Sequence, residues 1–270
     1  MRGASYPGRI VCLTEETTET LYLLGEQARI VGISGFTVRP RQARKEKPRV
    51  SAFTSEKLDK ILALDPDLVL GFPDLQADIA RDLVRAGLAV HIFNHRSVDG
   101  IFSMMRTVGA LVGAHDRAEL LLTELGAGLA EIRQRAARLP CRPRVYFEEW
   151  DEPMISAIGW VSELIAIAGG IDCFPELARQ AHGQGRIIAD TEEVVRRAPD
   201  IILGSWCGKR FRPEKVAARM GWANVPAVRT GHVFEIKSAD ILQPGPAALT
   251  DGVRRIHEIV AAWAEGRAAA

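Results

Sequence analysis

The chain has 270 residues, which is enough for one large domain or two of ordinary size. Apolar residues make up 47% and charged residues 26%, as is typical of a globular protein, and 35 basic residues nearly balance 34 acidic ones. This balance argues against a nucleic-acid-binding surface, which would need a surplus of basic residues.

The start of the chain, MRGASYPGRIVCLT, leads almost directly into an apolar run and contains no apolar segment typical of a secretory signal. No stretch of the sequence has the length and apolar character of a membrane span. We therefore expect no direct insertion into a membrane. The chain as given fits either a cytoplasmic protein or one whose signal has been removed.

Apolar runs alternate with helical patterns through the first half of the chain. The sequence predicts strands at residues 9–14, 28–34, 67–71 and 88–93, and helices at 18–25, 55–64 and 75–87. Pro66 ends the second of these helices, and a polar, basic loop is predicted at 35–50. This alternation of strands and helices indicates a parallel sheet covered on both faces.

One long helix is predicted in the middle of the chain. Its apolar residues recur at spacings of four and three, so they form a single stripe along one face. The stripe consists of Ala118, Leu122, Leu125, Leu129, Ile132, Ala136 and Leu139. Pro140 and Pro143 end the helix, and no flexible Gly/Ser-rich linker occurs there.

The second half repeats the order of the first. Strands are predicted at residues 144–150, 200–204 and 231–236, and helices at 161–170, 190–197, 213–221 and 246–265. The segment ILALDPDLVLGFPD returns as VVRRAPDIILGSWC, which places Asp67 and Asp200 133 residues apart. Gly87 and Gly221, which each end a helix, are 134 residues apart. A common offset indicates a duplicated topology.

The sequence therefore predicts an α/β protein with two similar Rossmann-like lobes, each with a central parallel sheet, joined by one long backbone α-helix. Residues 1–100 form the predicted N-terminal lobe, 101–142 the linking segment with the long helix, and 143–270 the C-terminal lobe with a closing helix. Ligands of open parallel sheets bind beyond the carboxyl ends of the strands. We therefore expect a ligand cleft between the lobes.

The candidate ligand-binding residues follow the predicted strands or lie in loops that could reach the same cleft. Only 6% of the chain is aromatic, yet these positions hold several large aromatic side chains, which suit a bulky, partly apolar ligand. Each single aromatic could instead belong to the core. The candidates are Thr14, Glu15, Phe36, Arg39, Phe53, Phe72, Asp74, Glu149, Trp150, Trp160, Trp206, Lys209, Asp240 and Gln243.

Signatures of enzymes and metal sites are absent from the sequence. No G-x-G-x-x-G motif follows the first strand, and the four cysteines form no CxxC pair. His91 and His95 fall on a strand and its exit loop, where they would not face one metal ion as a helical pair does. Strand alternation turns Glu148 and Glu149 to opposite sides, and we expect Glu149 to lie in the cleft as a hydrogen-bond acceptor rather than to act with Glu148 as a catalytic pair. We predict neither catalytic residues nor metal ligands.

Several strings in the sequence resemble one known family, and together they cover essentially the whole chain. RIVCLTEETTETLYLLG, ILALDPDLVLGFPD and VSELIAIAGG are similar to patterns of the class III periplasmic binding proteins, which serve ABC importers of cobalamin, haem and iron–siderophores. KLDKILALDPDLVL and YFEEWDEPMISAIGWVSELIAIAGG look most like the cobalamin-binding branch. The resemblance implies a non-enzymatic, monomeric, periplasmic carrier that binds a corrinoid metal chelate as its ligand and has no covalent cofactor.

The resemblance also implies roles for particular residues. Each lobe of such proteins offers a surface carboxylate to arginines of the transporter permease, and Asp59 and Glu192, each seven residues before a proline, match in the repeat. The helix dipole also favours acids at such positions, which is an equally good explanation. In the cobalamin branch aromatics and a polar loop hold the corrin; the corresponding residues here are Phe53, Phe72, Trp206 and Asp240.

Two other functions stay open. Arg39, Arg41 and Lys209 would suit an anionic iron–siderophore, and the same two-lobe cleft could belong to a cytoplasmic enzyme that handles tetrapyrroles or metal chelates. Haem ligation is disfavoured because the haem branch tends to use a cleft tyrosine. The three tyrosines of this chain, Tyr6, Tyr22 and Tyr146, all lie outside the predicted strand-end loops.

Overall fold

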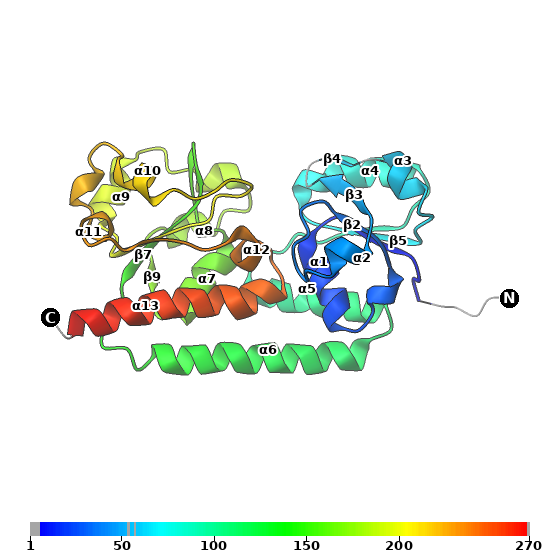
Figure 1. Cartoon of the computed structure of the whole chain (residues 1–270), viewed down its shortest axis with the longest axis horizontal. Coiled ribbons are helices and arrows are strands. Elements are labelled where there is room, and N and C mark those ends of the chain that lie inside the picture. Colours follow the sequence, from blue (N-terminus) through cyan, green and yellow to red (C-terminus); the bar gives the residue numbers. More distant parts are fainter. Residues whose placement is uncertain (1–5, 53–54, 57, 269–270) are drawn as a thin grey trace. The chain divides into compact units, whose positions relative to one another are not determined.

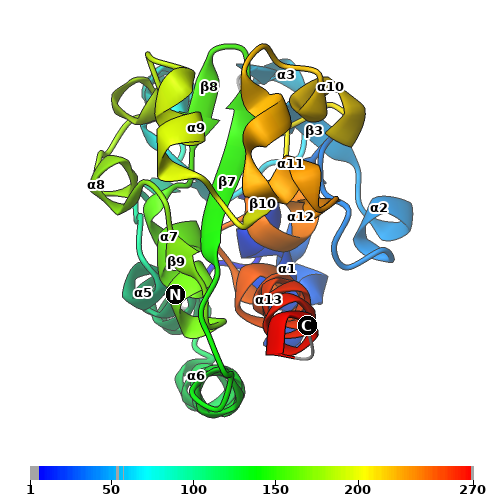
Figure 2. The same ribbon diagram turned by 90° about the vertical axis from the view of Figure 1, so that its left-hand side faces the viewer.

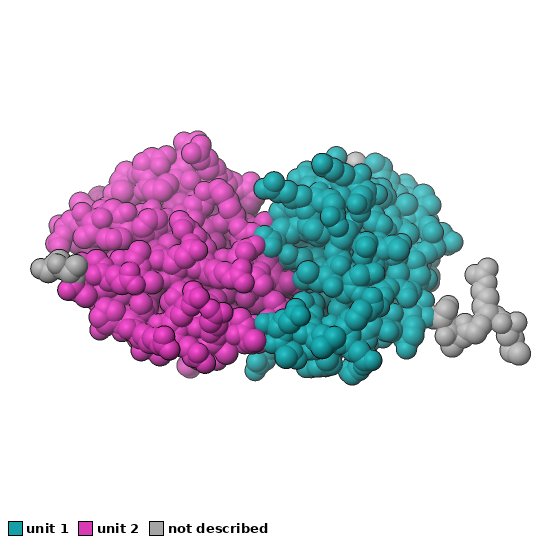
Figure 3. Space-filling model, turned by 60° about the horizontal axis from the view of Figure 1, so that its bottom comes forward, with its two compact units in different colours: residues 1–95, 99–124 teal, residues 96–98, 125–270 magenta. Residues whose placement is uncertain are grey.

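The structure is a computed structural model that describes residues 6–52, 55, 56 and 58–268. The chain divides into two compact units, shown in different colours in Figure 3. Unit 1 takes in residues 1–95 and 99–124, and unit 2 takes in residues 96–98 and 125–270. The predicted linking segment, 101–142, is thus shared between the units, with its first part in unit 1 and the rest in unit 2.

Unit 1 contains a six-stranded sheet in the order β4-β3-β2-β1-β5-β6. All neighbouring strands are parallel except β3 and β4, which are antiparallel. The strands are β1 Ile10–Cys12, β2 Ile30–Ser34, β3 Arg49–Ala52, β4 Ser55–Glu56, β5 Leu68–Gly71 and β6 Val90–Ile92. The four strands predicted for this half are confirmed. The prediction of a loop over residues 35–50 is partly wrong, because this segment holds a short helix and the start of β3.

Helices connect most of these strands, as expected for a parallel sheet, and α5 follows the last one (Figure 1). They are α1 Glu15–Leu23, η1 Gln27–Arg29, α2 Ala43–Glu46, α3 Leu58–Leu62, η2 Asp74–Gln76, α4 Ala77–Arg85 and α5 Val98–Leu111. Gly25 and Gly87 follow α1 and α4 with φ angles of 71° and 88°, a conformation in which a side chain is disfavoured. The predicted glycine stops of both helices are therefore confirmed.

The sheet of unit 2 has the order β11-β10-β7-β8, and β9 pairs with the first residues of β7. Strands β7, β10 and β11 are parallel, whereas β8 runs antiparallel to β7. The strands are β7 Arg144–Asp151, β8 Met154–Ser156, β9 Ile171–Asp172, β10 Ile201–Gly204 and β11 Val233–Glu235. Figure 2 shows β7 between α9 and α11. The three strands predicted here are confirmed; β8 and β9 were not predicted.

Unit 2 holds the helices that follow α6 (His115–Ala136), including the closing helix at the end of the chain. They are α7 Gly159–Ile167, α8 Pro175–Ala178, η3 Gly183–Arg186, α9 Glu192–Arg197, α10 Pro213–Ala217, η4 Trp222–Asn224, α11 Pro226–Arg229, α12 Ser238–Ile241, η5 Ala248–Gly252 and α13 Val253–Ala268. The predicted closing helix at 246–265 includes a π-helical turn, η5, which leads into α13.

The long helix predicted in the middle of the chain is α6, His115–Ala136. Its predicted stripe is buried from Ala118 to Ala136, and Leu139 lies beyond the end of the helix and is only half-buried. The apolar spacing therefore identified the buried face correctly. Within the described ranges, no helix combines the length and the apolar character needed to cross a membrane.

The duplication predicted from the sequence extends to individual hydrogen bonds. The Asp67 N–H donates to the Arg9 carbonyl (2.9 Å), and the Asp67 carboxylate accepts the N–H of Arg9 (2.9 Å). In unit 2, the Asp200 N–H donates to the Arg144 carbonyl (2.8 Å), and its carboxylate accepts the Arg144 N–H (2.8 Å). Each aspartate thus ties the start of one strand to the start of its parallel neighbour.

Candidate functional site

The carboxyl end of β1 leads directly into α1, so two predicted ligand-binding residues lie at the start of a helix. Thr14 precedes the helix and Glu15 is its first residue, earlier than the predicted start at Thr18. Both side chains are buried, with exposures of 2% and 7%, and a Glu15 carboxylate oxygen accepts the Val38 N–H (3.2 Å). Burial raises the pKa of Glu15 to about 7. Unit 1 therefore presents protonatable carboxyl groups where a strand ends.

The loop after β2 carries two further candidates. Phe36 is 53% exposed, so it offers an apolar surface next to the strand end. The Arg39 guanidinium is bound to the Glu19 carboxylate, with Nε and Oε1 2.9 Å apart. This ion pair already neutralises much of the positive charge that an anionic ligand would need.

The end of β5 holds Phe72 and Asp74. Phe72 is 6% exposed, its ring lies 5.1 Å from that of His95, and its N–H donates to the Gln76 side chain (3.0 Å). Phe72 is therefore buried and contacts His95 and Gln76 of unit 1. Asp74 is half-buried at the start of η2. Phe53 lies outside the described residues.

In unit 2, Glu148 and Glu149 turn to opposite sides of β7, as strand alternation predicts. Glu149 makes a bidentate ion pair with Arg186, at 2.6 and 3.0 Å, and Arg186 also donates to the Ser156 carbonyl (2.6 Å). Arg186 is only 3% exposed. Glu149 thus accepts hydrogen bonds from a buried arginine of the chain itself, and its role toward a ligand stays a prediction.

A half-buried tryptophan and a lysine meet at the carboxyl ends of β7 and β10. The Lys209 ammonium lies 4.2 Å from the centroid of the Trp150 ring and 5.0 Å from that of Trp206. Lys209 also forms an ion pair with Asp151. The Trp150 indole N–H donates to the Glu152 carbonyl (2.9 Å). This cluster combines an aromatic face, a cation and a carboxylate at the strand-end edge of unit 2.

Trp206 lies deeper than Trp150. It is 3% exposed, packs 4.9 Å from the Phe211 ring, and its indole N–H donates to Glu148 (2.9 Å). Glu148 is fully buried and makes a bidentate ion pair with Arg219, at 2.6 and 2.9 Å, while the Tyr146 hydroxyl donates to it at 2.8 Å. Four donors thus hold one buried carboxylate, which positions Trp206 rigidly.

Three further candidates lie in other parts of unit 2. The expectation that Trp160 lies in a loop is wrong: it is in the first turn of α7, is 2% exposed, and donates its indole N–H to the Ile241 carbonyl (2.9 Å). Asp240 belongs to α12 and is half-buried. Gln243 is also half-buried, and its carbonyl accepts the Gly245 N–H (2.8 Å).

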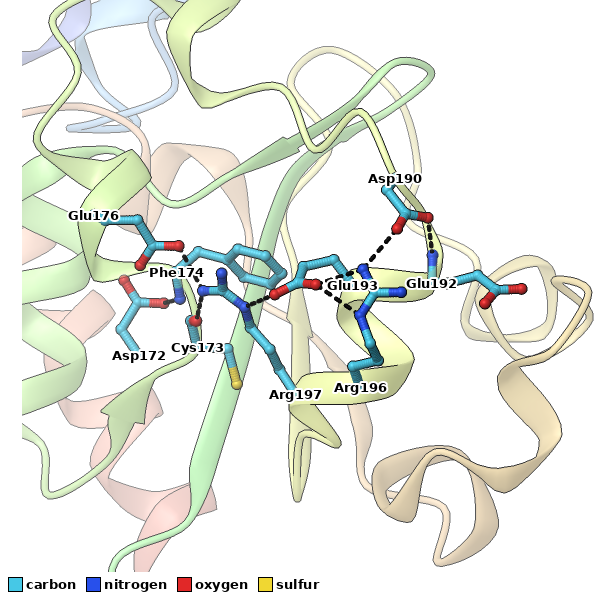
Figure 4. A network of polar contacts seen from close by, with 9 residues as sticks. All are labelled: Asp172, Cys173, Phe174, Glu176, Asp190, Glu192, Glu193, Arg196 and Arg197. Atoms are coloured by element: carbon cyan, nitrogen blue, oxygen red, sulfur yellow. Dashed lines mark hydrogen bonds and ion pairs between the residues drawn. The ribbon is translucent and has the colours of Figure 1, made fainter.

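The two candidate docking acids are exposed at the starts of equivalent helices. Asp59 is in the first turn of α3, and Glu192 is the first residue of α9. Figure 4 shows the Glu192 carboxylate pointing away from its neighbours Arg196 and Arg197, whose ion pairs go to other acids, Glu193 among them (2.6 and 2.7 Å). Glu192 is therefore exposed to solvent and available to a partner.

No group of three or more His, Cys, Asp or Glu side chains that could hold a metal ion occurs among residues 6–52, 55, 56 and 58–268. Two of the four cysteines, Cys12 and Cys173, are buried, and burial raises the pKa of each thiol to about 12. Both are thus held as neutral thiols.

Some residues at the strand-end edges could not be predicted. Leu75 is 63% exposed beside Asp74, although its four-residue spacing to the buried Ile79 and Leu83 suggests a core position. The 3₁₀ turn η2 changes the helical phase before α4 begins, which turns Leu75 outward. Arg186 gave no sequence signal, because its partner lies 37 residues away.

Comparison with known proteins agrees with this architecture. A cobalamin-binding protein of Halobacterium salinarum (strain ATCC 29341 / DSM 671 / R1) is 27% identical over 256 residues, which cover 90% of this chain and 66% of that protein. The periplasmic vitamin B12 binding protein of Vibrio cholerae superposes with a TM-score of 0.76 and 21% identity, over 95% of this chain and 98% of that one. A periplasmic haem-binding protein from Roseiflexus sp. RS-1 gives a TM-score of 0.77 and 25% identity, over 95% and 100%.

These solved structures confirm the predicted α/β fold with two parallel-sheet lobes. The family model described as "Periplasmic binding protein" matches residues 10–239, which is most of the chain. The chain belongs to this periplasmic binding protein family, whose members are substrate-binding proteins of ABC transporters and not enzymes.

Proposed function

We propose that this protein binds a corrinoid metal chelate of the cobalamin type, as the substrate-binding component of an ABC importer or as a soluble relative of one. The cobalamin-binding relative, which aligns with 90% of this chain, is the observation that carries the proposal. We further propose that both units contribute strand-end residues and that the protein acts as a monomer.

The chemistry of the two strand-end edges fits such a ligand. A corrinoid has a large macrocycle with an apolar face and a rim of amide side chains. The exposed Phe36 and the half-buried Trp150 offer apolar contacts, while Lys209 and Asp151 offer a donor and an acceptor beside Trp150. Amides need both kinds of partner.

Haem is the second candidate, because a haem-binding protein is among the similar structures and His95 lies just after β6. Two of the three tyrosines are bound to carboxylates of the chain. Tyr146 is fully buried and bound to Glu148, and the Tyr22 hydroxyl donates to Glu46 at 2.8 Å. An iron–siderophore is favoured less, since Arg39 is paired with Glu19 and Lys209 with Asp151.

A panel of chelates separates these functions. Cyanocobalamin, dicyanocobinamide, ferric haem and a ferric siderophore are each mixed with the protein, and bound chelate is quantified by its visible absorbance after gel filtration. We expect both corrinoids to elute with the protein at a ratio of about one to one. Retention of haem or the siderophore alone would overturn the assignment.

We also propose that Asp59 and Glu192 dock on basic residues of an ABC permease. Their exposure and their matching positions at the starts of α3 and α9 support this role. Asp59→Lys and Glu192→Lys should abolish pull-down of the cognate permease in detergent while chelate binding stays unchanged. The exposed Glu124→Lys is the matched control. Full pull-down by both docking variants would contradict the proposal.

A further inference from the structure

Three carboxyl side chains lie close together in sequence at the start of α1, and all are nearly buried. Glu15, Glu16 and Glu19 are 7%, 1% and 9% exposed. Glu19 is paired with Arg39, whereas Glu15 and Glu16 have neutral donors: the Val38 N–H for Glu15, and the Thr14 hydroxyl and its own backbone N–H for Glu16. Acidic side chains are seldom buried without a cationic partner. The burial of the Glu15 and Glu16 carboxyls without a bound cationic side chain is therefore unusual.

Two buried polar atoms, one of them in the Glu16 carboxyl, lack a hydrogen-bond partner among the residues that the structure describes. They are Oε2 of Glu16 and Oγ1 of Thr37, and both are buried. Thr37 is 0% exposed and directly precedes Val38, whose N–H binds Glu15, so the two unsatisfied groups belong to the same neighbourhood. Buried polar atoms are nearly always hydrogen-bonded in folded proteins. These two atoms are consistent with a partner that the chain does not supply.

The surrounding charges leave the two carboxyls easy to protonate. Burial, together with repulsion from neighbouring glutamates, raises the pKa of Glu15 and of Glu16 to about 7; Glu19 contributes to both shifts and Glu16 to that of Glu15. Arg44, from α2, lowers the pKa of Glu15, and Arg39 is engaged by Glu19. Burial, and to a smaller extent the charge of Glu16, raises the pKa of the Cys12 thiol on β1, so this thiol stays neutral. Near neutral pH the pair can therefore accept or donate hydrogen bonds.

We propose that Glu15 and Glu16 select the ligand of unit 1 by accepting hydrogen bonds from uncharged amide groups on its rim and by repelling ligands whose rim carries carboxylates. This inference rests on the proposed function. The rim of a corrinoid carries primary amides, which have two N–H donors each. Haem carries two propionates. Placing these anions beside the buried carboxyls of Glu15 and Glu16 is unfavourable when the carboxyls are ionised.

Affinities of two ligands for three variants test this selection. Dissociation constants for cyanocobalamin and ferric haem are measured at pH 6 and pH 8 for the wild type, Glu15→Gln, Glu16→Gln and the exposed control Glu124→Gln. Glutamine keeps the size and an acceptor but removes the charge. We expect each site variant to bind haem at least tenfold more tightly at pH 8 than the wild type does, with corrinoid affinity reduced less than fivefold. The control should match the wild type.

The pH arm gives an independent readout. The wild type should bind haem more tightly at pH 6 than at pH 8, since the carboxyls become protonated, and Glu16→Gln should lose most of this dependence. Should Glu16→Gln fail to fold, Glu15→Gln and the wild-type pH dependence decide the matter. Suppose that the proteins bind the corrinoid, but that the ratio of the haem and corrinoid dissociation constants is the same in the variants as in the wild type and haem binding does not depend on pH. This result overturns the present inference and leaves the proposed function standing. Absence of corrinoid binding in every protein, wild type included, overturns the proposed function itself.

Discussion

Asp65 and Ala198 share a left-handed backbone conformation, with φ angles of 45° and 44°, although 133 residues separate them. They are the two non-glycine residues with positive φ in the described part of the chain, and each directly precedes a proline, Pro66 or Pro199. In both units this residue lies between the end of a helix and the start of the next strand. The duplication therefore preserves a costly backbone conformation as well as the order of elements.

The two left-handed residues should respond differently to glycine. Alanine is strained by about 1–2 kcal/mol in this conformation, whereas aspartate adopts it more readily. Part of the relief is offset because glycine is more flexible when unfolded. We expect Ala198→Gly to raise the free energy of unfolding by about 0.5–1 kcal/mol and Asp65→Gly to raise it less. Urea denaturation measures both, and a larger gain for Asp65→Gly would contradict the argument.

The buried ion pair of Glu148 and Arg219 should be costly to break on one side. Glu148→Leu leaves the guanidinium without its bidentate partner, and Arg219→Met leaves a buried carboxylate uncompensated. Each single change should lower the free energy of unfolding by about 3–5 kcal/mol. The double variant should lose less than the sum of the two. A double-mutant cycle in urea measures the difference, and additive losses would show that the pair is not coupled.

Trp150 and Trp206 should separate ligand binding from stability. Trp206→Ala removes a buried ring and the hydrogen bond to Glu148, so we expect a loss of about 3–5 kcal/mol in the free energy of unfolding. Trp150→Ala should cost clearly less stability but weaken chelate binding by more than tenfold. Thermal melts and binding titrations on both variants check this. A Trp150→Ala protein with wild-type affinity would remove Trp150 from the ligand surface.

Stability should fall as pH rises through neutrality. The pKa of Glu15 and of Glu16 is about 7 in the folded chain, above the ordinary value of 4.5. The folded state therefore holds more protons between these values, so the stabilisation is complete below pH 4.5 and is lost as pH rises through 7. The loss should be on the order of 3 kcal/mol per group.

Comparison at pH 5 and pH 8 isolates this effect. The wild type should lose more free energy of unfolding between the two pH values than the double variant Glu15→Gln, Glu16→Gln does. Urea denaturation at each pH gives the values. Equal losses in both proteins would mean that other groups govern the pH dependence.

Most of the fold could be predicted from the sequence because its signals are local. Runs such as residues 67–71 are short, apolar and preceded by a proline, and the stripe of α6 repeats along a single helix. The β7–β8 hairpin was missed because Met154–Ser156 is too short to show alternation. Glu15 was predicted in a loop, since two glutamates followed by threonines do not look like the first turn of a buried helix.

The candidate site was less predictable, because burial and pairing depend on tertiary contacts. The sequence placed Trp150 and Trp206 alike at strand ends, but the core formed with Phe211 covers Trp206. The pairing of Glu149 with Arg186 joins residues 37 apart in the chain, and no local pattern predicts it.

Isothermal titration of the protein with cyanocobalamin tests the central claim most directly. Corrinoid binding by strand-end residues predicts a saturable isotherm with a stoichiometry of about one, and a heat signal that is strongly reduced for Trp150→Ala. An isotherm without heat at high micromolar ligand, together with an unchanged visible spectrum of the corrinoid, would contradict the claim.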